Sequence, residues 1–203
     1  ISKVYSLKHY QADSAATPLI ETGQFPRKIV TDVVPPMILY RGYPKTQDIT
    51  TDYRLPAGAP VMSYVEPKPT LQWQVKPEKR EILGHSCQRA EVSFGGRQWI
   101  AWFTSEIPLS EGPYKFGGLP GLLLEVADSE GDYRYTCIGI ANLSAGENIV
   151  RWKWNQRPTT RKELEKIIVQ LYANPEQAIK ALGGRMGFKG DPMLNLPYNP
   201  IEK

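Results

Sequence analysis

Alternation of apolar and polar residues in the middle of the chain predicts β-strands there. The segments 71–76 and 89–94 both alternate in this way, as half-buried strands do. Gly95 and Gly96 follow the second segment directly and precede a third strand-like segment, 97–103. Two glycines between strands are typical of a tight turn with positive φ. The pattern therefore predicts an antiparallel hairpin centred on these glycines.

Three later segments also have the apolar character of strands. They are 122–127, 133–141 and 149–154, and a cluster of turn-forming residues at 128–132 separates the first two. Short strands joined by local turns predict an antiparallel meander. A sheet of this length is expected to curl into a half-barrel or a barrel-like form. We therefore expect a mainly β fold built on one curled antiparallel sheet.

Helical periodicity is confined to the last quarter of the chain. Thr160, with Glu163 three residues later, predicts a capping box. Apolar residues then recur at helical spacing, at Leu164, Ile167, Ile168 and Leu171. A second short helix is predicted to begin at Asn174-Pro175 and to end at Gly183-Gly184. We expect this helical segment to close one side of the sheet.

Prolines interrupt the first 70 residues. Of the 18 prolines, nine lie there, and seven of these fall between Pro35 and Pro69. Each proline removes a backbone donor and fixes φ, so neither a long helix nor a central strand is expected. We predict an extended segment with short edge strands.

Length and composition fit one globular domain. The 203 residues are 41% hydrophobic and 23% charged, which is enough to form a core. No apolar run approaches the roughly 18 residues that a membrane-spanning helix needs. We divide the expected single domain, 1–203, into a Pro-rich extended segment (1–70), an antiparallel meander (71–155), and a helical segment with a C-terminal tail (156–203).

The charge balance points to no particular ligand. Lysine and arginine exceed the acidic residues by 25 − 21 = 4, but they form no basic block, so no nucleic-acid partner is expected. The chain begins at Ile1 rather than at a methionine, which suggests a mature or trimmed form.

Candidate catalytic and metal-binding residues are sparse. The patterns G-x-S-x-G, G-x-G-x-x-G and G-x-x-x-x-G-K-[ST] do not occur. His85 and Cys87 lie on the same side of a predicted strand, but a metal site typically needs three or four convergent ligands. Glu106 and Glu111 flank a loop and are expected at the surface. We therefore expect no enzymatic activity, no cofactor and no metal site.

Cys87 and Cys137 are the two cysteines of the chain. They fit either two free thiols in a reducing compartment or one disulfide in an oxidising compartment. A bridge closing a loop of about 50 residues contributes ~4 kcal/mol in the chain-entropy model.

Glycine and proline are densest between residues 112 and 121, where four glycines and two prolines occur. Such a composition dictates a fixed backbone path, and the interleaved aromatic residues and leucines indicate that the path is buried. We expect the glycines Gly117, Gly118 and Gly121 to serve the backbone. The structural motif comprises Gly112, Pro113, Phe116, Gly117, Gly118, Leu119, Pro120, Gly121 and Leu122.

This motif resembles the signature of the GLPGLI family of Bacteroidota, also called the Porph_ging family. The similarity lies in GPYKFGGLPGLLLEVAD (112–128), and it extends upstream to ILGHSCQRA (82–90), Gly96-Arg97 and AWFTSEIP (101–108). The segment YNPIE (198–202) is similar to the ending of the family's proteins. Leu123 replaces the last isoleucine of the signature.

The resemblance implies an exported protein, located in the periplasm or associated with the outer membrane. Genes of the family often lie near genes for outer-membrane receptors and transporters, and the family supplies no catalytic residues. In that oxidising compartment, we expect a disulfide between Cys87 and Cys137.

We therefore expect a non-enzymatic cell-envelope module that docks on or accompanies an outer-membrane protein complex, such as a transporter, a receptor or assembly machinery. The suspected partner is an outer-membrane β-barrel or a lipoprotein. Trp152 and Trp154 share one face, and with Arg151 they are docking candidates, because Trp and Arg are frequent in interface hot spots. The alternative for the tryptophans is a place in the core. The alternative function is binding of a lipid or another apolar ligand in the curved sheet.

Overall fold

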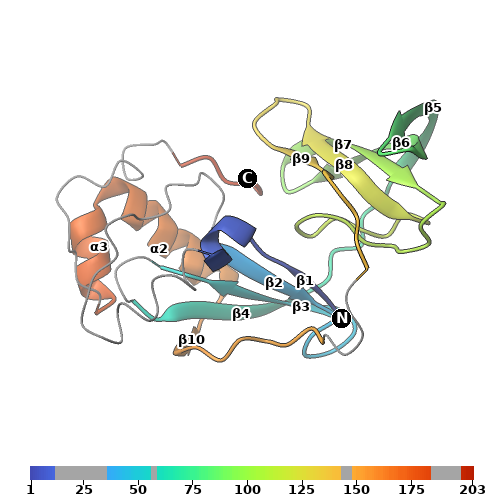
Figure 1. The fold of residues 1–203 in the computed structure, drawn as a ribbon. Coiled ribbons are helices and arrows are strands. Elements are labelled where there is room, and N and C mark those ends of the chain that lie inside the picture. The colour runs from blue at the N-terminus through green and yellow to red at the C-terminus, as the bar shows by residue number, and fades with distance from the viewer. Residues whose placement is uncertain (12–35, 56–58, 143–147, 184–197) are drawn as a thin grey trace. The chain divides into compact units, whose positions relative to one another are not determined.

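The chain forms two compact units, each built on a five-stranded sheet (Figure 1). A computed structural model describes residues 1–11, 36–55, 59–142, 148–183 and 198–203. Unit 1 comprises Ile1–Pro67 and Ile149–Tyr198, and unit 2 comprises Lys68–Asn148 and Asn199–Lys203. The predicted mainly β fold is confirmed. In place of the one curled sheet that was expected, two separate sheets form, and neither closes into a barrel.

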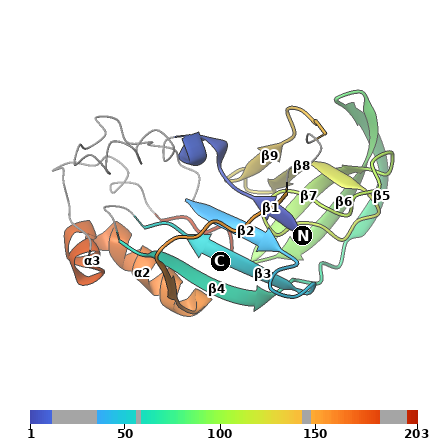
Figure 2. The same ribbon diagram turned by 60° about the horizontal axis from the view of Figure 1, so that its bottom comes forward.

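Unit 1 contains a mixed sheet with the strand order β1-β2-β3-β4-β10 (Figure 2). Neighbouring strands from β1 to β4 run antiparallel, whereas β10 pairs in parallel with β4. The strands are β1 (Ser2–Val4), β2 (Met37–Arg41), β3 (Asp48–Tyr53), β4 (Val61–Pro67) and β10 (Gln156–Pro158).

The proline-rich segment supplies the middle of this sheet, so the prediction of an extended segment with edge strands is wrong. Strands β2, β3 and β4 all lie between prolines and are largely buried. Pro36 precedes β2, Pro44 lies between β2 and β3, Pro60 precedes β4, and Pro67 is the last residue of β4. Because each proline falls at a strand end, the missing donors do not interrupt the ladder.

Two helices follow the sheet of unit 1, as predicted. They are α2 (Arg161–Ala173) and α3 (Pro175–Ala181). The capping box is confirmed, since Thr160 Oγ1 accepts from the amide of Glu163 at 3.2 Å and the Glu163 carboxylate accepts from the amide of Thr160 at 2.9 Å. The apolar face of α2 packs on the sheet through Leu164 and Ile168, which join a core of Tyr53, Leu55, Met62 and Tyr64.

Among the described residues, no helix combines the length and the apolar character that crossing a membrane requires.

Unit 2 contains an antiparallel meander with the strand order β5-β6-β7-β8-β9. The predicted hairpin is confirmed, with Phe94 paired to Arg97 and with φ of 58° at Gly95 and 73° at Gly96. The strand predicted over 133–141 shortens to three residues, and no strand forms at 149–154. The strands are β5 (Gln74–Ile82), β6 (His85–Phe94), β7 (Arg97–Thr104), β8 (Leu122–Asp128) and β9 (Arg134–Thr136).

The glycine-proline motif lies against this sheet and fills its core. Phe116 is fully buried, and its ring centroid lies 4.6 Å from that of Trp99 and 5.7 Å from that of Phe94. The indole of Trp73 donates to the carbonyl oxygen of Gly117 at 2.9 Å. These contacts fix the path of the motif, so that its aromatic residues serve packing.

The three glycines of the motif serve the backbone in different ways. Gly118 has φ of +90°, a conformation that a side chain disfavours. Gly121 lacks this conformation, but a Cβ there would lie 2.0 Å from the carbonyl oxygen of Thr104. A Cβ at Gly117 would lie 3.0 Å from the carbonyl oxygen of Ser110. Close approach of two backbone segments therefore requires glycine at 121, and backbone conformation favours it at 118.

The two cysteines are free thiols, so the structure contradicts the predicted disulfide. Cys87 lies in β6, whereas the amide of Cys137 donates to Leu124 on the far side of β8. Three strand spacings of about 4.8 Å separate the two positions by roughly 14 Å. A disulfide needs Cα atoms about 4.4–6.8 Å apart. The prediction rested on the number of cysteines and the inferred compartment, neither of which specifies strand order.

We expect two titratable thiols when the unreduced protein is unfolded in denaturant. In the folded protein, Cys137 should react with a disulfide reagent much faster than Cys87, because burial shields Cys87 and raises the pKa of its thiol. Alkylation followed by peptide mass spectrometry measures both rates. A Cys87–Cys137 linked peptide from unreduced protein would contradict the expectation.

Candidate functional site

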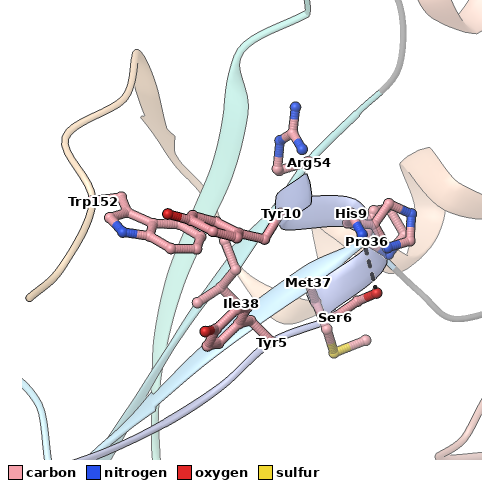
Figure 3. Close-up of a pocket in the computed structure, with 9 residues that line it drawn as sticks. All are labelled: Tyr5, Ser6, His9, Tyr10, Pro36, Met37, Ile38, Arg54 and Trp152. Atoms are coloured by element: carbon pink, nitrogen blue, oxygen red, sulfur yellow. Dashed lines mark hydrogen bonds between the residues drawn. The ribbon is translucent and has the colours of Figure 1, made fainter. Parts of the chain in front are cut away.

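Four aromatic rings from distant parts of the chain meet in unit 1, where the segment before β10 contacts β2 and β3. We call Tyr5, Tyr10, Trp152 and Trp154 the aromatic platform. Tyr10 stacks on Trp152 with centroids 5.1 Å apart, and Trp154 stacks on the same indole at 5.6 Å. Tyr5 meets Trp152 edge-on at 5.4 Å. Figure 3 shows the rings of Tyr5, Tyr10 and Trp152 gathered beside β2.

Two cations lie over this platform. The Lys3 ammonium lies 3.3 Å from the centroid of Trp152, and the Arg54 guanidinium lies 4.9 Å from that of Trp154. A cation over an indole face is the strongest of the ordinary cation–π arrangements. Burial lowers the pKa of Lys3 and that of Arg54 below their usual values. The platform therefore combines flat apolar rings with partly desolvated positive charge.

The segment that bears the tryptophans is held by an ion pair to the sheet. Arg151 donates from Nη2 to Asp52 Oδ1 at 2.7 Å and from Nε to Asp52 Oδ2 at 3.1 Å. Asp52, in β3, is almost fully buried, and its carboxylate raises the pKa of Arg151. The amide of Trp152 also donates to the hydroxyl of Tyr40 at 3.2 Å. Arg151 thus positions the tryptophans and is largely committed to Asp52, whereas the sequence placed it on a docking surface.

Both tryptophans are half-buried, so neither a core pair nor a fully exposed edge describes them. Tyr5 and Tyr10 are each 42% exposed. Exposed apolar residues extend the surface, since Val150 is 65% exposed and its carbonyl oxygen accepts from Lys3 Nζ at 3.3 Å. Leu7, between the two tyrosines in sequence, is 59% exposed. The result is an amphipathic aromatic surface.

The cavity under the platform is small. It holds about 10 Å³ and is bordered by Tyr10, Trp152 and Arg54 together with His9, Pro36 and Ile38 (Figure 3). That volume is about the minimum for one water molecule. The rings of the platform are therefore closely packed on the residues beneath them.

In unit 2, His85 pairs with Glu106, which was expected simply to lie at the surface. His85 Nδ1 lies 2.7 Å from Glu106 Oε2, and the amide of Ser86 donates to Glu106 Oε1 at 3.1 Å. These hydrogen bonds lower the pKa of Glu106. Cys87, next along β6, is fully buried. The ring nitrogen that faces Glu106 is thus committed to a side-chain pair on the surface of the unit.

A second cluster in unit 2 surrounds Arg97. The carboxylates of Asp128, Glu130 and Asp132 approach one another within 4.8 Å, close enough to suggest a cation site. Arg97 Nη1 already lies among them, at 2.7 Å from Asp128, 3.2 Å from Glu130 and 2.7 Å from Asp132. The guanidinium supplies the positive charge that these carboxylates need. In the sequence, Gly96-Arg97 stands out only as part of the family resemblance, and no local pattern predicts the cluster, because its members lie up to 35 positions apart.

Comparison with known proteins agrees with the resemblance seen in the sequence. A family model described as "Protein of unknown function (Porph_ging)" matches residues 95–125, a stretch that includes the hairpin glycines, Arg97 and the whole glycine-proline motif. No curated protein matches the chain.

Two solved structures of PNGF-II align with 69% of this chain at 14% sequence identity. The TM-score is 0.46 for the C2 crystal form and 0.44 for the P21 form. The chain spans 26% of the length of those proteins.

Proposed function

We propose that this chain is a non-enzymatic protein-binding module of the bacterial cell envelope. It docks on or accompanies an outer-membrane protein complex, and the aromatic platform of unit 1 is its contact surface. The partner is an outer-membrane β-barrel or a lipoprotein, and the module resides in the periplasm or at the outer membrane. The location rests on the family resemblance, and the contact surface rests on the structure.

The observation that supports docking is the stacked ladder Tyr10–Trp152–Trp154 with Lys3 and Arg54 over it. Binding hot spots are rich in Trp, Tyr and Arg, because large rigid rings bury much area at little entropic cost. The ion pair between Arg151 and Asp52 fixes the ladder before binding. A preorganised surface loses less conformational entropy when a partner covers it.

The geometry gives less support to an apolar-ligand binder. A pocket for a small molecule usually encloses several hundred Å³, whereas the cavity at the platform holds about 10 Å³. The two sheets are also open rather than closed around an interior.

The test is site-specific photocrosslinking on native membranes. A photoreactive residue at Lys153, exposed between the two tryptophans, should yield a discrete crosslinked outer-membrane protein. Trp152→Ala should reduce that product at least tenfold, the effect of losing about 1.4 kcal/mol of binding free energy. Tyr10→Ala, which truncates a residue exposed to 42%, should reduce it as well.

The matched control is Trp102→Ala in unit 2. Trp102 is also half-buried and also lies under a guanidinium, that of Arg80 at 4.2 Å, but it belongs to another surface. It should leave the crosslink unchanged. If the platform variants melt normally and keep the product, or if the control removes it equally, the proposal is wrong.

A further inference from the structure

The five residues Asn199–Lys203 belong to unit 2, although the segment before them, Ile149–Tyr198, belongs to unit 1. Residues 184–197, which lead to them, are outside the described part of the chain. The hydrophobic core of unit 2 is built by other segments, with Trp99, Phe116 and Leu124 among its fully buried residues. Of the five, only Ile201 adds a buried apolar side chain, at 6% exposure.

Backbone groups of this segment are bound by the hairpin β6–β7. The amide of Lys203 donates to the carbonyl oxygen of Gly95 at 2.7 Å. The carbonyl oxygen of Pro200 accepts from Arg97 at 3.1 Å (Nη2) and 3.3 Å (Nε). The Asn199 side-chain oxygen accepts from Arg97 Nη2, and the Asn199 carbonyl oxygen accepts from the hydroxyl of Tyr133. Main-chain recognition of this kind is typical of bound peptides.

The side chain of Glu202 is recognised by a buried cation. Its carboxylate accepts from Lys115 Nζ at 2.6 Å and from the hydroxyl of Tyr114. The Lys115 and Glu202 side chains are 2% and 7% exposed. An ion pair buried to this degree strongly favours a carboxylate over a neutral side chain at position 202, because a neutral replacement leaves the Lys115 charge unpaired.

The two glycines of the hairpin leave room for the segment. A Cβ on Gly95 would lie 2.7 Å from Glu202 Cγ, and a Cβ on Gly96 would lie 3.0 Å from Lys203 Cβ. Arg97 Nη1 pairs with the fully buried Asp128 and with Asp132, which also accepts from Asn199, while Nη2 and Nε of Arg97 donate to the segment. These features distinguish a binding site from ordinary packing between two parts of a core.

We propose that unit 2 contains a peptide-binding site whose occupant is the segment Asn199–Lys203. The site recognises a short peptide with an asparagine amide, a proline carbonyl, an apolar side chain and a carboxylate in that order. Recognition does not depend on the covalent link, so the same segment of a second copy of this chain can occupy the site. This inference concerns a surface other than the aromatic platform.

The test uses the full-length double variant Ile201→Asp/Glu202→Lys. These changes place a charge at the apolar position 201 and a lysine beside Lys115, so the chain's own segment should leave the site. A fluorescent peptide Asn-Pro-Ile-Glu-Lys, blocked at both ends, should then bind with saturation and 1:1 stoichiometry in an anisotropy titration. The wild-type chain should bind it at least tenfold more weakly, because its own segment competes.

A matched peptide tests the ion pair. Replacement of its glutamate by glutamine should weaken binding to the double variant at least tenfold. Adding Lys115→Met to the variant should reduce that difference to less than threefold. Photocrosslinking at the platform provides a separate readout, so failure here and failure of the proposed function are distinguishable.

The opposite results would overturn the inference. If the double variant loses its cooperative thermal transition, the segment is part of the core of unit 2. If it melts cooperatively but does not bind the peptide, no separable site exists. Equal affinity for a scrambled peptide, or equal affinity of the wild-type chain, would show that binding occurs without the proposed recognition.

Discussion

Replacement of Gly121 by alanine should destabilise unit 2 by about 3 kcal/mol, at the upper end of the usual cost of overpacking a core. A Cβ at this position would lie 2.0 Å from the carbonyl oxygen and 2.6 Å from the carbonyl carbon of Thr104. Both atoms are backbone at the end of β7, so no flexible side chain can move away. The loop must therefore separate from the strand, which opens the packing around Phe116. Urea unfolding followed by tryptophan fluorescence measures the loss.

Gly118→Ala is the matched control in the same motif. Gly118 has φ of +90°, but a Cβ added there would meet no heavy atom within 4 Å, so only backbone conformation opposes the change. Its cost should be about 1–2 kcal/mol. Equal destabilisation by the two variants would show that close approach to Thr104 is not what requires glycine at 121.

Arg97→Met should cost about 3–5 kcal/mol, the effect of removing one partner from a buried ion pair. The Arg97 and Asp128 side chains are both fully buried, and their atoms lie 2.7 Å apart. The methionine would leave the Asp128 carboxylate without this cation. Arg134→Met is the control, because Arg134 pairs with Glu125 while its own side chain is 67% exposed. An exposed pair of this kind contributes at most about 1 kcal/mol.

The stability lost in Arg97→Met should depend on pH, and the direction follows from the pKa of Asp132. Hydrogen bonds from Asn199 and Arg97 lower the pKa of Asp132 below its usual value. A carboxylate with a lowered folded-state pKa contributes stability that is present above its unfolded pKa and is lost as the pH falls through its folded pKa. The difference between wild type and Arg97→Met should therefore shrink below about pH 4, the usual pKa of an aspartate. Urea titrations at neutral pH and at about pH 3 measure it, and a difference that stays constant with pH would contradict a role for charge.

Elements with local signals were predictable from the sequence. The hairpin turn depends on two adjacent glycines, and the start of α2 depends on Thr160 and Glu163 within one helical turn. In each case, the atoms that interact are within three residues of one another, so the pattern contains the interaction itself. The proline-rich segment predicted only short edge strands, because a proline removes a donor from the ladder. In the structure, the prolines lie at the ends of β2, β3 and β4, so these strands form the middle of the sheet.

The candidate sites depended on contacts that no local pattern contains. The platform joins Tyr5 and Tyr10 to Trp152, more than 140 positions later, because the segment before β10 returns over the sheet, where it contacts β2 and β3. The tryptophans could be singled out by their spacing, but their partners and the role of Arg151 could not.

The sequence by itself determined the strands at 89–94, 97–103 and 122–127, the hairpin glycines and the capped helix, because residue chemistry and periodicity specify backbone conformation over short distances. Tertiary structure alone decided that the chain divides into two units and that Cys87, in β6, and Cys137, just after β9, lie too far apart to bond. It also decided that Arg97 contacts three carboxylates and the segment Asn199–Lys203. The physical reason is that strand order and register fix which distant side chains meet. Periodicity along the chain identifies the strands but does not specify their order.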